Sequence, residues 1–462
     1  MEVLWEGEEA SASDVDLAIF QAKEAVSPWS AASLEKRMGV LENFKTLLEK
    51  EKASFTETIA KETGKTLWDS EGEVNAMIAK VAISRDSYLE RCPERRQEFP
   101  AAQSVTRHKP HGVLVVFGPF NFPGHLPGGH IIPALLAGNS VVFKPSELTP
   151  LVGELLVGLF HKAGVPKQAL QLLQGGKTVG KLIASHPQIN GLLLTGSWDT
   201  GKALLQQFAT HPEKILALEL GGNNPLVVSD IDHMDAAVYV TLQSAFITAG
   251  QRCTCARRLI LIESPKSESY LEKLIKATAS LKVGAYDDKP EPFMGAIISL
   301  QAKEQLLKAQ ESLIKAGAHP LVKMGSLDRK GIFISPGILD VTSLSERKDQ
   351  EHFGPLLQVI RVKSFQEALE EAKKTQFGLT AGLLSTRVKE YHTFYNQMEA
   401  GIINWNTPTT GASSRAPFGG LGHSGNFRPS AYYAADYCSY PIASMESRTI
   451  NLPKTPLPGI TL

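Results

Sequence analysis

Cysteine is scarce in this sequence. The 462 residues include four cysteines, Cys92, Cys253, Cys255 and Cys438, and none forms a Cys-x-x-Cys pair. Such sparse cysteine excludes a disulfide-stabilised scaffold and gives no support to a structural zinc site, so no metal site is expected. A cysteine in an unusual context is therefore a candidate for chemistry.

An excess of charge of either sign is also absent. Lys plus Arg and Asp plus Glu both total 48, so the formal net charge is zero. Nothing in the bulk charge attracts a polyanion or an anionic lipid surface. Neither nucleic acid nor a membrane is an expected partner.

Long hydrophobic runs are missing as well. Apolar runs such as Gly112–Gly118 fall far short of the roughly 18 residues that a membrane span needs. The first residues are acidic rather than basic and apolar, so no signal peptide is visible. We expect a soluble protein located in the cytoplasm.

The composition that remains is globular. Hydrophobic residues make up 43% and charged residues 21% of the sequence, close to ordinary averages. At roughly 150 residues per domain, the length predicts two or three packed domains.

Helical periodicity dominates the first hundred residues. Apolar positions three and four apart predict a helix with Ser13 as its N-cap and Asp16 three residues on, ending at Pro28. The same pattern continues over 34–48 and again over 74–83. The apolar residues of these helices are expected to pack in the core of the protein.

From Val113 onward, short apolar segments alternate with helical ones. This alternation predicts parallel sheets covered on both faces, in a doubly wound α/β architecture, with a second α/β domain beginning near Asn223. The proline-rich C-terminal stretch is expected to be an extended arm or edge strand. The first block has predicted strands at 113–117, 140–143, 170–173, 192–195 and 215–219, and helices at 131–137, 151–163, 179–184 and 201–208. The second has a strand at 226–229, a helix at 235–248, a strand at 259–262, and further segments at 356–362, 368–374, 382–385 and 402–404.

The first candidate for chemistry is Cys253, in the polar, turn-like segment Gly250–Cys255. Backbone N–H groups around it and the adjacent Arg252 would lower its pKa and favour a nucleophilic thiolate. The alternative is a buried cysteine that packs as a small hydrophobic residue.

Two polar side chains follow predicted strands. Glu219 closes an apolar strand, and a surrounding of low polarity would raise its pKa toward that of a general base. The alternative is a solvated or Lys-paired carboxylate. The Asn121 amide could donate to a developing oxyanion, although turn formation is its commoner role.

Two further strand ends carry groups suited to a nucleotide. Gly196, Ser197 and Gly201 span a strand-to-helix turn that could present N–H groups to a phosphate. Lys144 and Glu147 could hydrogen-bond a ribose, with Glu147 repelling a 2′-phosphate. The alternative for the glycine-containing segment is an ordinary turn with an N-cap. The alternative for Lys144 and Glu147 is a solvated charged turn.

Taken together, these segments resemble the aldehyde dehydrogenase superfamily. The resemblance implies an α/β aldehyde dehydrogenase fold, with a doubly wound NAD-binding domain (1–91, 111–222 and 422–437), a second α/β catalytic domain (223–421) and a small oligomerisation arm (92–110 and 438–462). The matching motifs, in family order, are Pro119–Pro123, Lys144–Glu147, Gly196–Gly201, Glu219–Gly222, Gly250–Cys253, Glu351–Pro355 and Pro417–Gly420.

Three longer stretches, Asn121–Asn139, Gly250–Leu259 and Asn404–Ala443, resemble more specifically the N-succinylglutamate 5-semialdehyde dehydrogenases of arginine catabolism. That resemblance implies NAD-dependent oxidation of an anionic semialdehyde to a carboxylate. The chain departs from the pattern at Arg415, where a small residue is commoner, and in beginning close to the first helix.

The resemblance also implies roles for residues. Cys253 would attack the aldehyde, Asn121 would hold the oxyanion, and Glu219 would activate water to hydrolyse the thioester. The expected cofactor contacts are Lys144, Glu147, Gly196, Ser197, Gly201, Glu351 and Phe353. The expected substrate contacts are Thr254, Gly411, Ala412 and Ser413.

Other interpretations remain open at this point. The substrate could be another acidic semialdehyde, such as succinic or glutamate semialdehyde. A CoA-acylating enzyme is disfavoured because it needs no water-activating Glu219. An alternative from a different functional class is a structural or binding protein that has this fold but no catalytic activity. The resemblance further implies a homodimer or a dimer of dimers.

Overall fold

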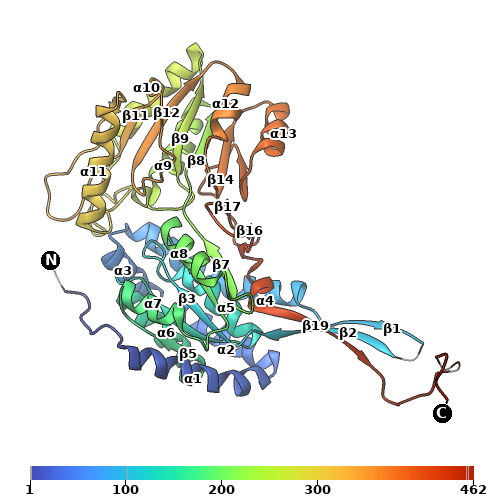
Figure 1. Cartoon of the computed structure of the whole chain (residues 1–462). Helices are drawn as coiled ribbons and strands as arrows, with labels where there is room; N and C mark the ends of the chain where they lie inside the picture. The colour runs from blue at the N-terminus through green and yellow to red at the C-terminus, as the bar shows by residue number, and fades with distance from the viewer. Residues whose placement is uncertain (1–2, 101, 454, 456, 462) are drawn as a thin grey trace.

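The structure is a computed structural model that describes residues 3–100, 102–453, 455 and 457–461. Residues 1 and 462, the outer limits of the predicted domains, lie outside this range, as does Glu2. Figure 1 shows two lobes joined by a narrower region, with an arm extending from the lobe that holds both the N-terminal helices and the first sheet. None of the described helices is long and apolar enough to cross a membrane.

The first lobe is built on a five-stranded parallel sheet of order β5-β4-β3-β6-β7. Successive residues of β3 face opposite sides: Leu114 and Val116 pack with one group of helices, and Val113 and Val115 with another. Its strands are β3 (Val113–Phe117), β4 (Ser140–Lys144), β5 (Leu170–Leu172), β6 (Gly191–Thr195) and β7 (Ile215–Glu219). Its helices are α1 (Ala12–Ala31), α2 (Leu34–Lys50), α3 (Lys52–Thr63), α4 (Leu67–Arg91), α5 (His125–Ala137), α6 (Pro150–Ala163), α7 (Lys177–Ser185) and α8 (Trp198–Phe208).

Helix α1 corrects the predicted N-cap. The cap is Ser11, not Ser13: the Ser11 hydroxyl accepts from the Asp14 N–H at 3.2 Å, and the Asp14 carboxylate accepts from the Ser11 N–H at 2.9 Å. The predicted end at Pro28 was also wrong, because the helix continues to Ala31. The next side chain, Trp29, is buried and its indole donates to a carbonyl of α5, which holds the last turn in place.

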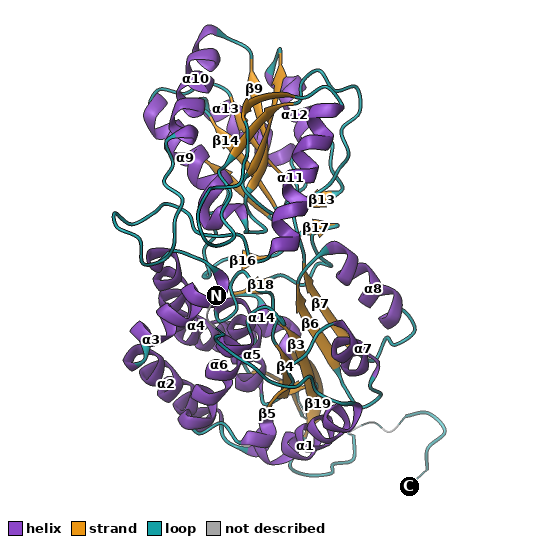
Figure 2. Ribbon diagram, turned by 90° about the vertical axis from the view of Figure 1, so that its left-hand side faces the viewer, coloured by secondary structure: helices purple, strands orange, loops and turns teal. Residues whose placement is uncertain are grey.

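The second lobe is built on a seven-stranded sheet of order β10-β11-β12-β9-β8-β14-β15, in which β10 pairs antiparallel and the other strands pair in parallel. Figure 2 shows helices on both faces of this sheet. Its strands are β8 (Asn224–Val228), β9 (Ala256–Ile262), β10 (His319–Val322), β11 (Gly337–Asp340), β12 (Leu356–Val362), β14 (Thr380–Leu384) and β15 (Ile402–Trp405). Its helices are α9 (Met234–Phe246), α10 (Pro265–Ala279), α11 (Leu300–Lys315), α12 (Phe365–Ala372) and α13 (Val388–Gln397), and short 3₁₀ turns lie at Lys167–Ala169 in the first lobe and Ile247–Gly250 in the second.

The arm is a three-stranded antiparallel sheet of order β1-β2-β19. Its strands are β1 (Arg95–Glu98), β2 (Gln103–Pro110) and β19 (Ser439–Glu446). The prediction of helices up to residue 100 was therefore wrong for β1, whose exposed polar residues pair in register with β2. The prediction of an extended arm or edge strand is confirmed for β19, which contains Pro441, whereas Pro456 of the same stretch lies outside the described residues. Short elements complete the chain: β13 (Phe377–Gly378), β16 (Pro417–Phe418), β17 (Leu421–Gly422), β18 (Ser430–Ala431) and α14 (Ala434–Cys438).

Candidate functional site

The polar residues singled out in the first lobe gather at one edge of its sheet. Asn121 follows β3, Lys144 ends β4, Ser197 follows β6 and Glu219 ends β7. Because all five strands are parallel, these positions lie at the same carboxyl edge. That edge faces the second lobe in Figure 1.

The cysteine segment follows a sharp break after α9. Thr248 and Ala249 have positive φ values of 56° and 52°, so α9 ends at Phe246 and not at residue 248 as predicted. Gly250 is also left-handed, at φ 69°, and a Cβ there would lie 2.2 Å from the Gly354 carbonyl oxygen. Only glycine permits this close approach.

Hydrogen bonds hold the backbone around the thiol. The Asn224 amide donates to the carbonyls of Cys253, at 2.7 Å, and Cys255, at 2.8 Å. The Arg257 guanidinium, which is fully buried, donates to the carbonyls of Gly250 and Arg252 at 2.7 and 2.9 Å. The nucleophile candidate therefore lies on a rigid loop.

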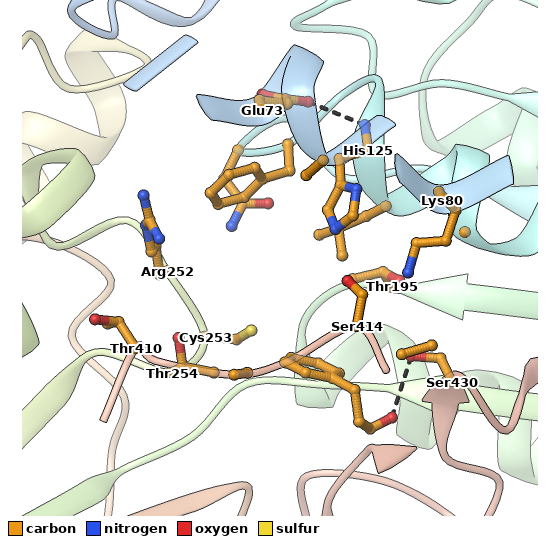
Figure 3. Close-up of a pocket in the computed structure, with 18 of the residues that line it drawn as sticks. Glu73, Lys80, His125, Thr195, Arg252, Cys253, Thr254, Thr410, Ser414 and Ser430 are labelled. Carbon is orange, nitrogen blue, oxygen red and sulfur yellow. Dashed lines mark hydrogen bonds between the residues drawn. The ribbon is translucent and has the colours of Figure 1, made fainter. Parts of the chain in front are cut away.

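Cys253 opens onto a cavity of about 340 Å³ between the lobes, whereas Cys255 is fully buried. The walls come from α4, α5, the cysteine segment and the stretch 410–431. Figure 3 shows the Cys253 sulfur among these side chains. Predicted residues that line the cavity are Asn121, Cys253, Thr254, Ala412 and Ser413.

The expected lowering of the Cys253 pKa is contradicted. Burial is the largest influence and raises the pKa of this thiol, the Glu351 and Glu219 carboxylates raise it further, and Arg257 lowers it. Arg252, expected to favour the thiolate, instead forms an ion pair with Asp69 at 2.7 Å. The cation that favours the thiolate is thus Arg257.

Glu219 is almost completely buried at the end of β7. Its Oε1 accepts from the Ser430 N–H at 3.1 Å, and burial raises the pKa of the carboxyl well above its ordinary value. Its Oε2 is buried with no hydrogen-bond partner in the described chain. Glu219 lies behind Ser430, which lines the cavity. These surroundings suit a base that meets water or a reaction intermediate.

Asn121 places its side chain beside the cysteine segment. The amide nitrogen donates to the Gln251 carbonyl at 2.9 Å, and the side chain is buried at the cavity wall. One of the two amide hydrogens is used in this bond. The other remains for a developing oxyanion.

The residues predicted to bind the cofactor divide into two groups. Lys144 Nζ donates to the Pro145 and Gly175 carbonyls at 2.8 and 2.7 Å, and it lies 3.8 Å from the exposed carboxylate of Glu147. Burial lowers the pKa of Lys144. Glu351, in contrast, lies at the cysteine segment.

The second group surrounds the thiol. Glu351 accepts from the Gly222 N–H at 3.2 Å and lies 3.6 Å from Arg257, while Phe353 makes an edge contact with Phe120. Burial raises the pKa of Glu351. The first group therefore lies at the end of β4, and Glu351 of the second lies beside Arg257.

The turn at β6 differs in one respect from its prediction. Ser197 is the N-cap of α8 and accepts from the Thr200 N–H at 3.3 Å, directly after Gly196. The Gly201 N–H, however, donates to the Ser197 carbonyl, and a Cβ on Gly201 would lie 2.6 Å from Leu220. Gly201 is needed for close packing, not to present an N–H group.

The predicted carboxylate-binding loop is only partly available. The Gly411 N–H donates to the Pro408 carbonyl at 3.0 Å, so it is already used in a turn. Ala412 and Ser413 line the cavity, and Ser413 Oγ accepts from the Arg415 N–H. The Arg415 side chain is exposed, lies 3.5 Å from Asp86 and is not part of the cavity wall.

Several ionisable residues of the wall were not predicted. Asp69, Glu73 and Lys80 come from the inner face of α4, and His125 and His130 come from α5. Asp69 pairs with Arg252, and Glu73 pairs with Lys65 at 2.7 Å. The spacing of polar residues four and seven apart within an otherwise apolar helix face was the available signal.

Comparison with known proteins agrees with this arrangement. A model of the aldehyde dehydrogenase family matches residues 1–441. The N-succinylglutamate 5-semialdehyde dehydrogenase of Ectopseudomonas mendocina (strain ymp) is 54% identical over 460 residues, covering 100% of this chain and 94% of that protein. The enzyme of the same name from Paraburkholderia xenovorans (strain LB400) is 52% identical over 457 residues, covering 99% and 94%.

Solved structures show the same fold. Glyceraldehyde-3-phosphate dehydrogenase GapN from Methanocaldococcus jannaschii DSM 2661, complexed with NADP, has a TM-score of 0.89 and 26% identity, covering 97% of each chain. Aldehyde dehydrogenase 21 from Physcomitrella patens, in complex with the reaction product succinate, has a TM-score of 0.88 and 25% identity, covering 96% of this chain and 92% of that one. With the thiol, the amide and the buried carboxylate at the junction of the lobes, this protein belongs to the aldehyde dehydrogenase family.

Proposed function

We propose that this chain oxidises N-succinylglutamate 5-semialdehyde to N-succinylglutamate with NAD. The observation that carries the proposal is full-length identity of 54% and 52% to two enzymes of that name. The cavity supports it, because one wall carries the Cys253 thiol and other walls carry donors suited to an anion.

Catalysis begins at the thiol. Cys253 Sγ bonds to the aldehyde carbon, and the oxygen becomes an oxyanion that the free Asn121 N–H and the Cys253 backbone N–H stabilise. Since burial raises the pKa of Cys253, the thiol must give up its proton to solvent water as the aldehyde binds. The positive charge of Arg257 favours that loss.

Loss of a hydride from the carbon of this adduct leaves a thioester on Cys253, and water then hydrolyses the thioester. Glu219 in its ionised form removes a proton from this water, and the raised pKa makes the carboxylate a stronger base. The Ser430 N–H orients one carboxylate oxygen, which leaves Oε2 to accept the proton. The product is the carboxylate, and Cys253 is restored.

The residues at the carboxyl edge of the first sheet fit a dinucleotide. Buried Lys144 and exposed Glu147 would contact the adenosine ribose, and Ser197 at the start of α8 would contact the pyrophosphate. Glu351 and Phe353 would lie on the nicotinamide side. Bound there, NAD would supply the acceptor for the hydride lost from the Cys253 adduct.

The same proposal includes the assembly and its location. We assign 1–91, 111–222 and 422–437 to the NAD-binding domain, 223–421 to the catalytic domain, and 92–110 with 438–462 to an oligomerisation arm. The exposed β1 edge of this arm supports a homodimer or a dimer of dimers. A cytoplasmic location, where NAD-dependent catabolism takes place, completes the proposal.

An aldehyde panel tests the function. Specificity constants are measured with NAD for N-succinylglutamate semialdehyde, succinic semialdehyde, glutamate semialdehyde and propanal, and are then repeated with NADP. We expect the succinylated substrate to rank first, and NAD to exceed NADP because Glu147 faces the ribose. Equal constants for the first three aldehydes would reduce the proposal to a general acidic-semialdehyde dehydrogenase.

A further inference from the structure

Lys80 is a buried cation without a partner. It lies on α4, is 3% exposed and lines the same cavity as Cys253. Within the described part of the chain it has no hydrogen bond and no ion pair. Two other buried lysines do have partners: Lys65 pairs with Glu73, and Lys144 donates to two carbonyls.

The other charges around the cavity are already compensated. Asp69 of α4 pairs with Arg252, and Glu73 of α4 pairs with Lys65. On α5, burial and the nearby Lys80 lower the pKa of His130 to about 3, and burial with nearby cations lowers the pKa of His125, so both imidazoles are neutral near pH 7. The wall therefore carries one unmatched positive charge, and an isolated buried charge is costly unless a ligand pairs with it.

Lys80 and the thiol lie on different walls of the cavity. Lys80 comes from α4, whereas Cys253 lies on the loop that follows α9. Figure 3 places Lys80 beside Thr195 and Ser414, away from Arg252, with its nitrogen directed into the cavity. A group bound by Lys80 therefore belongs to the far end of the substrate.

We propose that Lys80 is a specificity residue that binds the succinyl carboxylate of the substrate. The inference rests on the proposed function, whose substrate has a carboxylate at its far end. The Ser413 hydroxyl and the neighbouring backbone are left for the α-carboxylate. The Lys80 ammonium would then bind one carboxylate of the substrate, and uncharged hydroxyl and N–H donors would bind the other.

Kinetics of three aldehydes test this assignment. N-succinylglutamate semialdehyde has both carboxylates, N-acetylglutamate semialdehyde lacks the succinyl one, and propanal has neither. For Lys80→Met we expect the specificity constant of the first to fall about 10- to 100-fold, as for loss of a hydrogen bond to a charged group. The other two should change less than about threefold. Lys80→Arg should retain most activity, and Lys23→Met, at an exposed lysine of α1, is the matched control.

Each other outcome of the kinetics overturns the assignment. An equal fall for all three aldehydes would mean a structural role, and an equal fall for the two acyl substrates would place the α-carboxylate at Lys80. If none of the specificity constants falls, Lys80 does not bind the substrate. If the wild-type enzyme itself fails to prefer the succinylated substrate over the acetylated one, the proposed function fails first.

Proton uptake provides an independent readout. Burial lowers the pKa of Lys80 to about 8, so near pH 8.5 much of this amine is neutral, and a bound carboxylate would restore its proton. Calorimetry in buffers of different ionisation enthalpy should show more uptake with N-succinylglutamate than with N-acetylglutamate. The difference should vanish in Lys80→Met, and its persistence there would overturn the proposal. Thermal unfolding should show no loss of stability in this variant, because the substitution removes an unpaired buried charge.

Discussion

Two cysteines separated by one residue have different surroundings in this protein. Cys253 lines the cavity between the lobes, whereas Cys255 is completely buried and its thiol faces the Ile247 carbonyl. Reactivity requires access to the aldehyde, so the two thiols cannot exchange roles.

Substitution of each cysteine should separate these roles. Cys253→Ala should abolish aldehyde oxidation and ester hydrolysis, because no other thiol reaches the cavity wall in the described chain. Cys255→Ala should keep most activity and lose stability on the order of 1 kcal/mol, as for deletion of a small buried group. NADH formation and thermal unfolding measure both effects. An active Cys253→Ala enzyme would refute the assignment.

Glu219→Gln should separate oxidation from hydrolysis. The first turnover should proceed, but thioester hydrolysis should slow by about 100-fold or more, because glutamine cannot take the proton from water. A burst of NADH in rapid-mixing measurements would demonstrate the accumulated thioester. In the wild-type enzyme, hydrolysis should speed up as pH rises through the raised pKa of Glu219, since only the ionised form is a base. Loss of the burst would instead assign Glu219 to generating the thiolate.

At the scale of elements, the start of α1 offers a test of cap geometry. Ser11→Ala removes the hydroxyl that accepts from the Asp14 N–H, and Ser13→Ala removes one that hydrogen-bonds the Ser11 hydroxyl at 2.8 Å but no backbone N–H. We expect amide exchange in the first turn of α1 to accelerate roughly fivefold for Ser11→Ala, consistent with loss of an N-cap. Ser13→Ala should exchange close to the wild-type rate. The reverse order would show that the observed cap is not the stabilising one.

The elements also show what the sequence could predict. Strands β3 and β7 have the predicted bounds, because continuous apolar runs between turn residues leave little freedom in their ends. Helices α10 and α11 were not predicted, although Ser264 and Ser299 cap them. In α11 the fully buried residues are confined to Leu306 and Gln310, so its apolar stripe is weak.

The candidate site was predictable where chemistry follows a strand end. Asn121 and Glu219 were identified from such positions, Cys253 from its turn-like segment, and all three from the family resemblance. The pairing of Arg252 with Asp69, and the unmatched Lys80, depend on contacts between segments far apart in the chain. Sequence spacing carries no information about which charges remain unpaired after packing.

At the scale of the whole molecule, the arm pairs strands from two distant parts of the chain: β1 and β2, which precede the first sheet, and β19 near the C-terminus. Strand β19 pairs with β2 along its full length, from Ser439 opposite Pro110 to Glu446 opposite Gln103. A chain that ends at Ser439 lacks this strand and exposes the inner edge of β2. We expect this truncation to disperse the proposed oligomer, whereas a chain that ends at Glu446 should keep it. Light scattering measures the mass, and an unchanged oligomer after the longer deletion would contradict the role of the arm.

The path of the chain between the lobes has a mechanical consequence. Residues 220–223 leave the first lobe and residues 419–429 return to it, and the two crossings bond to each other: Leu220 N–H donates to the Ser424 carbonyl at 3.0 Å, and Ser424 Oγ donates to the Gly221 carbonyl at 2.6 Å. A doubled, hydrogen-bonded connection resists bending far more than a single linker does. Glu219 lies at its root and is held by Ser430, the residue directly after the returning segment. Any hinge motion between the lobes would therefore displace the proposed base, so we expect the two lobes to move as one body during turnover, with ligand exchange depending on side chains at the cavity mouth.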